Sequence, residues 1–301
     1  MKAEVSIPAS TRARRIAIQG VEGSFHEIAA HKFFGEDIEL DMCDSFPKLF
    51  RRLNTFEVDF GIIAIENSVA GSLLPNYALL RESDYTILGE VYLRIQHNLM
   101  ALPGTRVEKI TEIHSHPMAL NQCQQFLGKF PHIKMVESED TAQSAQQIRE
   151  ASLSNRAAIA SLRAASVYDL AVMEEAIEDN PRNFTRFLIL VHQESELLKE
   201  VSPQKASLCF NLAKMSQRVG SLAGILSILG HYDMNLTKIQ SLPLVGHEWQ
   251  YFFHIDLEFE AYDRYQQALD AIRPLVSELK ILGEYSRGEK PLATDFQTST
   301  P

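Results

Sequence analysis

Cysteine, tryptophan and long apolar runs are scarce in this chain of 301 residues. The three cysteines, Cys43, Cys123 and Cys209, are odd in number and lie far apart. They argue against a disulfide framework or a zinc site and predict buried thiols in a reducing cytoplasm. The apolar runs are no longer than strands, so no membrane-spanning helix is expected.

Basic residues are also fewer than acidic residues. The chain has 29 basic and 39 acidic residues and a formal net charge of −10, which argues against nucleic acid and anionic membranes as main partners. An anionic ligand would therefore need a locally positive pocket. Hydrophobic residues make up 45% and charged residues 23%, the balance of an ordinary globular protein that is long enough for two domains.

Short apolar runs alternate with helix-period segments from about residue 14 to residue 192. This alternation predicts an α/β fold with a mainly parallel sheet and helices on both faces. The predicted strands are 16–19, 38–43, 60–65, 86–92, 110–114, 133–137, 157–160 and 186–191. The clearest predicted helices are 118–130 and 142–151. Ligands on such sheets bind where strands end and helices begin.

A different rhythm follows a predicted linker at residues 195–203. The predicted strands there are 206–213, 236–242, 249–259 and 281–285, and the predicted helices are 220–232 and 263–279. The order βαββαβ predicts a ferredoxin-like module for binding or pairing. The first dozen residues are expected to form a loose arm and residues 288–301 a disordered tail.

Polar side chains gather at the predicted strand–helix junctions. The first junction holds Ser24 and Glu27 at capping-box spacing, and later junctions hold Glu66-Asn67-Ser68, Ser115-His116-Pro117 and Ser161. Backbone N–H groups at helix starts attract carboxylates, so several of them together would suit a small dianion. Each of these residues also has a plainer interpretation as a helix cap.

Thr185 and Arg186 lie side by side at the mouth of the strand at 186–191. Neighbouring strand residues point to opposite faces, so the two cannot both be core residues of one face. They could bind an anion and protonate a leaving oxygen, or they could be a β-former beside a solvated charge. For His97 and His116 we expect structural roles, and Gln122, seven residues after Ser115, should lie on the same side as that serine.

The order and spacing of these motifs resemble those of monofunctional prephenate dehydratases, which have a catalytic domain followed by an ACT regulatory domain. The resemblance runs from about Arg14 to Gly288, and Val21 stands where a proline is usual. The matching segments are Gly20–Phe25, Ile65–Ser68, Ser115–Pro117 with Gln122 and Cys123, Asp140–Ala142, Ala158–Ser161 and Thr185–Phe187. The implied domains are residues 14–195 for catalysis and 204–287 for the ACT domain.

The resemblance implies a bilobed catalytic domain like type II periplasmic binding proteins, with the active site between the lobes. The implied reaction turns prephenate into phenylpyruvate, carbon dioxide and water, and needs no metal or other cofactor because aromatisation drives it. By resemblance, Thr185 would donate to the departing hydroxyl and would relay a proton from water or from Glu66. The implied substrate-binding residues are Arg186, Phe187, Asn67, Ser68, Ser115, Gln122, Ser24 and Ser161.

The ACT resemblance implies phenylalanine as the effector, bound between paired ACT domains of a homodimer or homotetramer. The implied effector residues are Leu222, Asn235, Leu236 and Ser241. The family's Glu-Ser-Arg-Pro motif is Gln240-Ser241-Leu242-Pro243 here, so two charges are lost and affinity or coupling should change. The family's fused chorismate mutase domain is expected to be absent.

Two other functions remain open on the sequence. One is an arogenate dehydratase, which would make phenylalanine directly, and no residue separates the two substrates. The other is a non-catalytic cytoplasmic sensor of small acids on the same scaffold. The combination of Thr185-Arg186 with Glu66-Asn67-Ser68 argues against the sensor, because binding alone would not need it.

Overall fold

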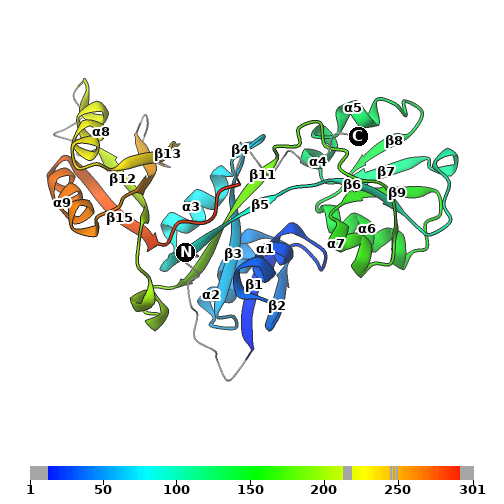
Figure 1. Ribbon diagram of the computed structural model, residues 1–301, viewed down its shortest axis with the longest axis horizontal. Coiled ribbons are helices and arrows are strands. Elements are labelled where there is room, and N and C mark those ends of the chain that lie inside the picture. The colour runs from blue at the N-terminus through cyan, green and yellow to red at the C-terminus, as the bar shows by residue number, and fades with distance from the viewer. Residues whose placement is uncertain (1–12, 213–218, 245, 247, 249, 292–301) are drawn as a thin grey trace. The chain divides into compact units, whose positions relative to one another are not determined.

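The computed structural model describes residues 13–212, 219–244, 246, 248 and 250–291 (Figure 1). Its contacts divide the chain into two compact units. We call residues 10–71 and 91–187 the two-sheet unit, and residues 72–90 and 188–301 the C-terminal unit. None of the described helices is long and apolar enough to cross a membrane.

The first sheet has the strand order β2-β1-β3-β11-β5, with the short β4 paired to β3. Its elements are β1 (Arg14–Gln19), α1 (Phe25–Phe34), β2 (Ile38–Cys43), α2 (Phe46–Asn54), β3 (Phe60–Asn67), β4 (Gly71–Ser72), β5 (Tyr85–Arg94) and β11 (Phe184–His192). β1 pairs in parallel with both β2 and β3. Residues 60–65 of β3 are buried, as expected for a strand covered on both faces.

The second sheet has the order β10-β6-β9-β7-β8. Its elements are β6 (Asn98–Ala101), η1 (Val107–Lys109), β7 (Glu112–Ser115), α4 (Pro117–Asn121), α5 (Gln124–Leu127), β8 (Lys134–Glu137), α6 (Thr141–Glu150), β9 (Arg156–Ala160), α7 (Leu162–Val167) and β10 (Ala171–Glu174). Successive residues of β9 pack into two different apolar clusters, Ala157 and Ile159 into one and Ala158 and Ala160 into the other. Both faces of this sheet are therefore covered, as strand alternation requires.

The bilobed α/β expectation is confirmed, because the unit has two open sheets instead of one. We call the part built on the first sheet the first lobe and the part built on the second sheet the second lobe. The strand alternation alone predicted one mainly parallel sheet. Two sheets form instead, and in the second β6 is antiparallel to β9 and β10 is antiparallel to β6. The short strands β6 and β10 were not predicted.

The predicted helix at 118–130 is also wrong, since two short helices replace it. The chain breaks at Gln122 and Cys123, and α5 starts afresh. The carboxylate of Asp179 accepts hydrogen bonds from the backbone nitrogens of Gln124 (3.0 Å) and Gln125 (2.9 Å). A tertiary contact thus caps amides that would otherwise continue the first helix, and no local pattern reveals it.

The C-terminal unit contains an antiparallel sheet in the order β13-β14-β12-β15. Its elements are α3 (Leu74–Glu82), η2 (Glu196–Glu200), β12 (Lys205–Leu212), α8 (Ser221–His231), β13 (Asn235–Pro243), β14 (Tyr251–Glu258), α9 (Tyr262–Ile272), η4 (Arg273–Leu275) and β15 (Val276–Tyr285). This βαββαβ order confirms the ferredoxin-like prediction. The predicted linker contains η2, and α3 was not predicted.

The last predicted helix was too long. α9 ends at Ile272, Pro274 lies in η4, and β15 begins at Val276, within the span predicted to be helical. Proline lacks the N–H that an interior helical position donates, so the helix stops before it. The predicted strand ends at 213 and 249, the amino-terminal arm and residues 292–301 of the predicted tail lie outside the described residues.

A buried ion pair ties β12 to the part of β5 that belongs to the C-terminal unit. The ammonium of Lys205 lies 3.0 and 2.9 Å from the two carboxylate oxygens of Glu90, and both side chains are almost fully buried. At Gly283 in β15, an added Cβ would lie 2.5 Å from the side chain of Ile87. Residues 72–90 therefore pack with the ferredoxin-like module as one body.

Candidate functional site

A cluster of hydrogen-bonded polar side chains lies at the carboxyl end of β3. The side-chain oxygen of Asn67 accepts hydrogen bonds from the backbone nitrogens of Val69 (2.9 Å) and Ala70 (2.8 Å). This is an Asx turn, in which the side chain stands in for a backbone carbonyl. It aims the amide nitrogen of Asn67 away from its own turn.

That nitrogen donates a hydrogen bond to the hydroxyl of Thr185, at the start of β11. Asn67 Nδ2 donates to Thr185 Oγ1 at 3.0 Å, and both residues are buried. A threonine oxygen that accepts a hydrogen bond still has its own proton to donate. Among the described residues, no acceptor takes the Thr185 proton. The site thus holds an O–H group whose oxygen is fixed in position, and its catalytic role stays a prediction.

Two amides connect this donor to the second lobe. Asn67 Nδ2 also donates to Asn183 Oδ1 at 2.7 Å, and Asn183 Nδ2 donates to Gln122 Oε1 at 2.8 Å. Gln122 stands at the break between α4 and α5. Asn183 was not predicted as a site residue, although it comes two positions before Thr185.

His97 completes the cluster, where a purely structural role had been expected. Its Nε2 lies 3.0 Å from Gln122 Oε1, and its backbone nitrogen donates to the carboxylate of Glu178 at 2.9 Å. Burial lowers the pKa of His97, the hydrogen bond to Gln122 raises it, and the nearby His116 lowers it. The net shift is downward, so the ring is neutral near pH 7. His116 instead caps α4 by accepting from the backbone nitrogen of Met118 at 3.1 Å.

The glycine-rich loop after β1 is held against the start of α7. Ser161 Oγ donates to the carbonyl of Gly23 at 2.6 Å and accepts from the backbone nitrogen of Ala164 at 3.0 Å. Ser24 caps α1 by accepting from the backbone nitrogen of Glu27 at 3.3 Å. The loop therefore joins the two lobes, and both predicted serines serve as caps.

The buried carboxylate of Glu27 makes a second link between the lobes. It accepts from the backbone nitrogen of Gly23 and from the guanidinium of Arg163, at 3.0 and 2.8 Å. The predicted capping box is therefore only half formed, because this carboxylate bonds Gly23 instead of returning to Ser24.

Three other predicted residues have structural partners. Ser115 is fully buried, and its hydroxyl donates to the carbonyl of Ile159 at 2.7 Å. Ser68 donates to the carbonyl of Arg182 and accepts from the backbone nitrogen of Phe184, both at 2.9 Å. Phe187 is 1% exposed and meets His26 edge-on at 5.0 Å. These contacts suit residues that build the site, and direct contact with a ligand stays a prediction for all three.

Glu66 and Arg186 are expected on the other face of the first sheet. Adjacent strand residues alternate between faces, and Asn67 and Thr185 share one face through their hydrogen bond. The backbone nitrogen of Ser68 donates to the carbonyl of Phe184. The relay from Glu66 to Thr185 and the binding role of Arg186 both stay predictions.

The predicted effector residues lie in the C-terminal unit. Leu222 in α8 and Leu236 in β13 are partly buried and pack against its core cluster. Asn235 and Ser241, also in β13, are exposed. On the same strand, Lys238 Nζ donates to Ser72 Oγ in β4 at 2.7 Å.

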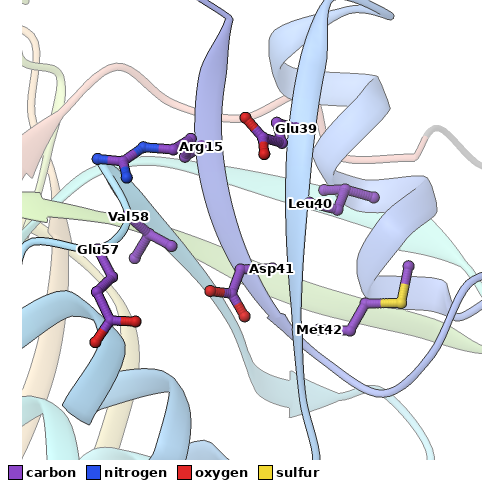
Figure 2. Close-up of a pocket in the computed structure, with 7 residues that line it drawn as sticks. All are labelled: Arg15, Glu39, Leu40, Asp41, Met42, Glu57 and Val58. Carbon is purple, nitrogen blue, oxygen red and sulfur yellow. The ribbon is translucent and has the colours of Figure 1, made fainter.

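A surface hollow of about 500 Å³ lies elsewhere, along the edge strand β2. Figure 2 shows its lining side chains, Arg15, Glu39, Leu40, Asp41, Met42, Glu57 and Val58. None of them belongs to the cluster around Asn67. Across the described part of the chain, no group of three or more histidine, cysteine, aspartate and glutamate side chains could hold a metal ion.

Comparison with known proteins places these residues in a family context. The family described as Prephenate dehydratase matches residues 16–195. A relative in Arabidopsis thaliana, named arogenate dehydratase/prephenate dehydratase 6, chloroplastic, is 34% identical over 95% of this chain and 72% of its own length.

Two solved structures resemble the chain in fold and sequence. One is a prephenate dehydratase from Arthrobacter aurescens in complex with L-Phe, 27% identical, with a TM-score of 0.81 over 91% of this chain and 90% of that one. The other is described as a novel type of quorum quenching acylase, 28% identical, with a TM-score of 0.81 over 91% of this chain and 98% of that one.

Substitution of Gly23 by alanine should loosen the link between the lobes. Gly23 has φ +85°, and an added Cβ would lie 2.7 Å from the Cα of Ala164. Gly35 is a matched control, because it has φ +83° but no atom within 4 Å of an added Cβ. We expect Gly35→Ala to cost only backbone strain, about 1–3 kcal/mol. Gly23→Ala should add a further cost of about 1–3 kcal/mol from overpacking.

Urea unfolding and hydrogen exchange of residues 20–27 test this prediction. Equal unfolding midpoints and equal protection in the two variants would show that the contact with Ala164 does not hold the loop.

Proposed function

The chain belongs to the prephenate dehydratase family, and on that premise we propose that it converts prephenate into phenylpyruvate, carbon dioxide and water for phenylalanine biosynthesis. The observation that carries this proposal is the free proton on Thr185. Its hydroxyl oxygen is held by Asn67 at 3.0 Å, so the O–H is oriented and available. A pure sensor of small acids has no need of such a donor.

The reaction requires one proton at the departing hydroxyl of the ring. The bond between the ring carbon and its hydroxyl breaks as the bond to the ring carboxylate releases carbon dioxide, and that electron pair completes the aromatic ring. One proton is taken up, and it turns the departing hydroxide into water. Thr185 would donate this proton and regain one from solvent.

A threonine hydroxyl is a weak acid, so its contribution depends on where it is held. The hydrogen bond from Asn67 stabilises negative charge on Thr185 Oγ1 while the proton is shared with the leaving group. Ser24 and Ser161 are proposed to help bind the two carboxylates of prephenate, alone or through nearby backbone amides, and Arg186 to attract the dianion by its positive charge. A cytoplasmic location and a homodimer or homotetramer stay predictions.

Purified protein incubated separately with prephenate and with arogenate tests the proposed activity. We expect phenylpyruvate absorbance to appear with prephenate, without added metal and with a chelator present. Phenylalanine released from arogenate at a higher kcat/KM would make the enzyme an arogenate dehydratase. Activity that a chelator abolishes and a metal restores would contradict the mechanism. Hydrolysis of an acyl amide with no dehydration of either substrate would favour the chemistry of the acylase relative.

Removal of the Thr185 hydroxyl should lower turnover far more than substrate binding. A lost proton donor typically costs about 10²–10⁴ in rate, or about 3–5 kcal/mol in activation free energy. Thr185→Ala and Thr185→Val should show this loss in kcat, whereas Thr185→Ser should retain substantial activity. Near-normal turnover of the alanine variant would assign Thr185 to a structural role.

Phenylalanine is proposed to bind the ferredoxin-like module and to inhibit the enzyme. The module would be an ACT domain, with Leu222, Asn235, Leu236 and Ser241 near the effector. The contact from Lys238 to Ser72 supports a route for the signal, because Ser72 follows the Asn67 turn by a few residues. An effector acts only through different affinities for two states, so this contact should differ between them.

Full-length variants test this regulation better than truncation, since removal of the module would leave Glu90 buried without Lys205. We expect calorimetry to detect phenylalanine binding to the wild type and no binding to Leu236→Glu. Lys238→Met should still bind phenylalanine but lose most of its inhibition, while Lys199→Met, at an exposed lysine, serves as the control. Inhibition that persists in Leu236→Glu would mean competition at the active site.

A further inference from the structure

The polar groups around Thr185 form one hydrogen-bond chain that has a direction. It starts at the backbone nitrogens of Val69 and Ala70, which donate to Asn67 Oδ1 at 2.9 and 2.8 Å. A backbone N–H can only donate, so this atom of Asn67 must be the oxygen. The opposite assignment would point the amino group of Asn67 at these two N–H donors and leave both without this acceptor.

That assignment determines the orientation of the next amide. Asn67 Nδ2 donates its two hydrogen bonds to Thr185 Oγ1 at 3.0 Å and to Asn183 Oδ1 at 2.7 Å. Asn183 therefore presents its nitrogen to Gln122, whose Oε1 accepts it at 2.8 Å. Each step is forced, since each buried donor needs an acceptor.

The hydrogen-bond chain ends at His97, where it determines which ring nitrogen carries the proton. Gln122 Oε1 can only accept, so His97 Nε2, 3.0 Å away, must carry the proton. A neutral ring then has an unprotonated Nδ1, and this buried atom has no hydrogen-bond partner among the described residues. The direction of the hydrogen-bond chain thus leaves His97 Nδ1 without a proton. A proton on that nitrogen would lack an acceptor.

We propose that Asn183 and His97 are positioning residues for Thr185, which act through Asn67 and Gln122 to keep the Thr185 proton free for the substrate. The proposal rests on the proposed dehydratase function. Asn183 accepts one of the two hydrogen bonds that Asn67 Nδ2 donates, so that the other is directed at Thr185 Oγ1. His97 fills the remaining acceptor capacity of Gln122, so that Gln122 cannot turn and present its nitrogen to Asn183.

Kinetics of the full-length enzyme with prephenate test the first part. Asn183→Leu should lower kcat about 10- to 100-fold, the effect of a small misplacement, with KM changed less than about 3-fold. Asn183→Asp keeps an acceptor for Asn67 and should lose less. The same Asn183→Leu change in a Thr185→Ala background should lower kcat no further, because its effect passes through Thr185. An equal loss in both backgrounds would overturn the proposal and indicate general damage.

Histidine variants test the other end of the chain. His97→Leu should lower kcat, and His97→Gln should recover much of it, because its amide nitrogen can still donate to Gln122. His254→Gln is the matched control: this histidine is also buried, in β14 of the C-terminal unit, and burial lowers its pKa to about 4. It should leave kcat unchanged without phenylalanine. Equal activity of the leucine and glutamine variants of His97 would overturn its positioning role.

Nitrogen-15 NMR of the imidazole rings decides the direction of the chain independently of activity. In the wild type at neutral pH, the His97 signals, assigned by their loss in His97→Gln, should be those of a neutral ring protonated on Nε2. In Asn183→Asp, the new carboxylate requires a donor, so Gln122 should turn and His97 should change to the Nδ1–H tautomer. A wild-type ring protonated on Nδ1, or on both nitrogens, would overturn the proposal.

The two measurements separate the failures. A wild-type protein without dehydratase activity would overturn the proposed function, and the NMR signals would still decide the hydrogen-bond chain.

Discussion

The carboxamide of Asn67 is the constraint on which the rest of the site depends. Two backbone amides of its own turn hold its oxygen, so its nitrogen can reach only outward, to Thr185 and Asn183. Through Asn183 the same group connects the end of β3 to Gln122 in the second lobe. One amide thus holds the hydroxyl of Thr185 and joins the two lobes.

Burial explains why this arrangement is so tightly specified. An amide that loses a partner in water finds another, whereas a buried amide without a partner costs about 1–3 kcal/mol. The same environment keeps His97 neutral, since desolvation disfavours its charged form. Ser24, Ser115 and Ser161, which have the composition of an anion site, have their hydroxyls engaged as caps or in bonds to carbonyls. The hydroxyl of Thr185 differs from those of Ser115 and Ser161, because its proton has no acceptor among the described residues.

The C-terminal unit includes a segment from the first half of the chain. Residues 72–90 lie in the sequence between two segments of the two-sheet unit, yet they pack with the ferredoxin-like module through Lys205–Glu90 and Gly283–Ile87. Within this unit, Lys238 of β13 also contacts Ser72.

The sequence by itself determined the elements whose signals are local. The short apolar run of β3, the ferredoxin-like order after residue 203 and the motif around Thr185 were all visible in the sequence, because strand pattern and chain order need no knowledge of distant residues. Glu66 and Asn67 are adjacent in that motif, and only strand alternation in a known register assigns them to opposite faces.

Other features were decided by tertiary structure alone. Asp179 splits the predicted helix at 118–130, and Asn183 and His97 enter the site through partners 61 and 25 residues away in sequence. No local pattern marks such residues, since the free energy that selects them comes from satisfying buried donors and acceptors brought together only when both lobes have formed.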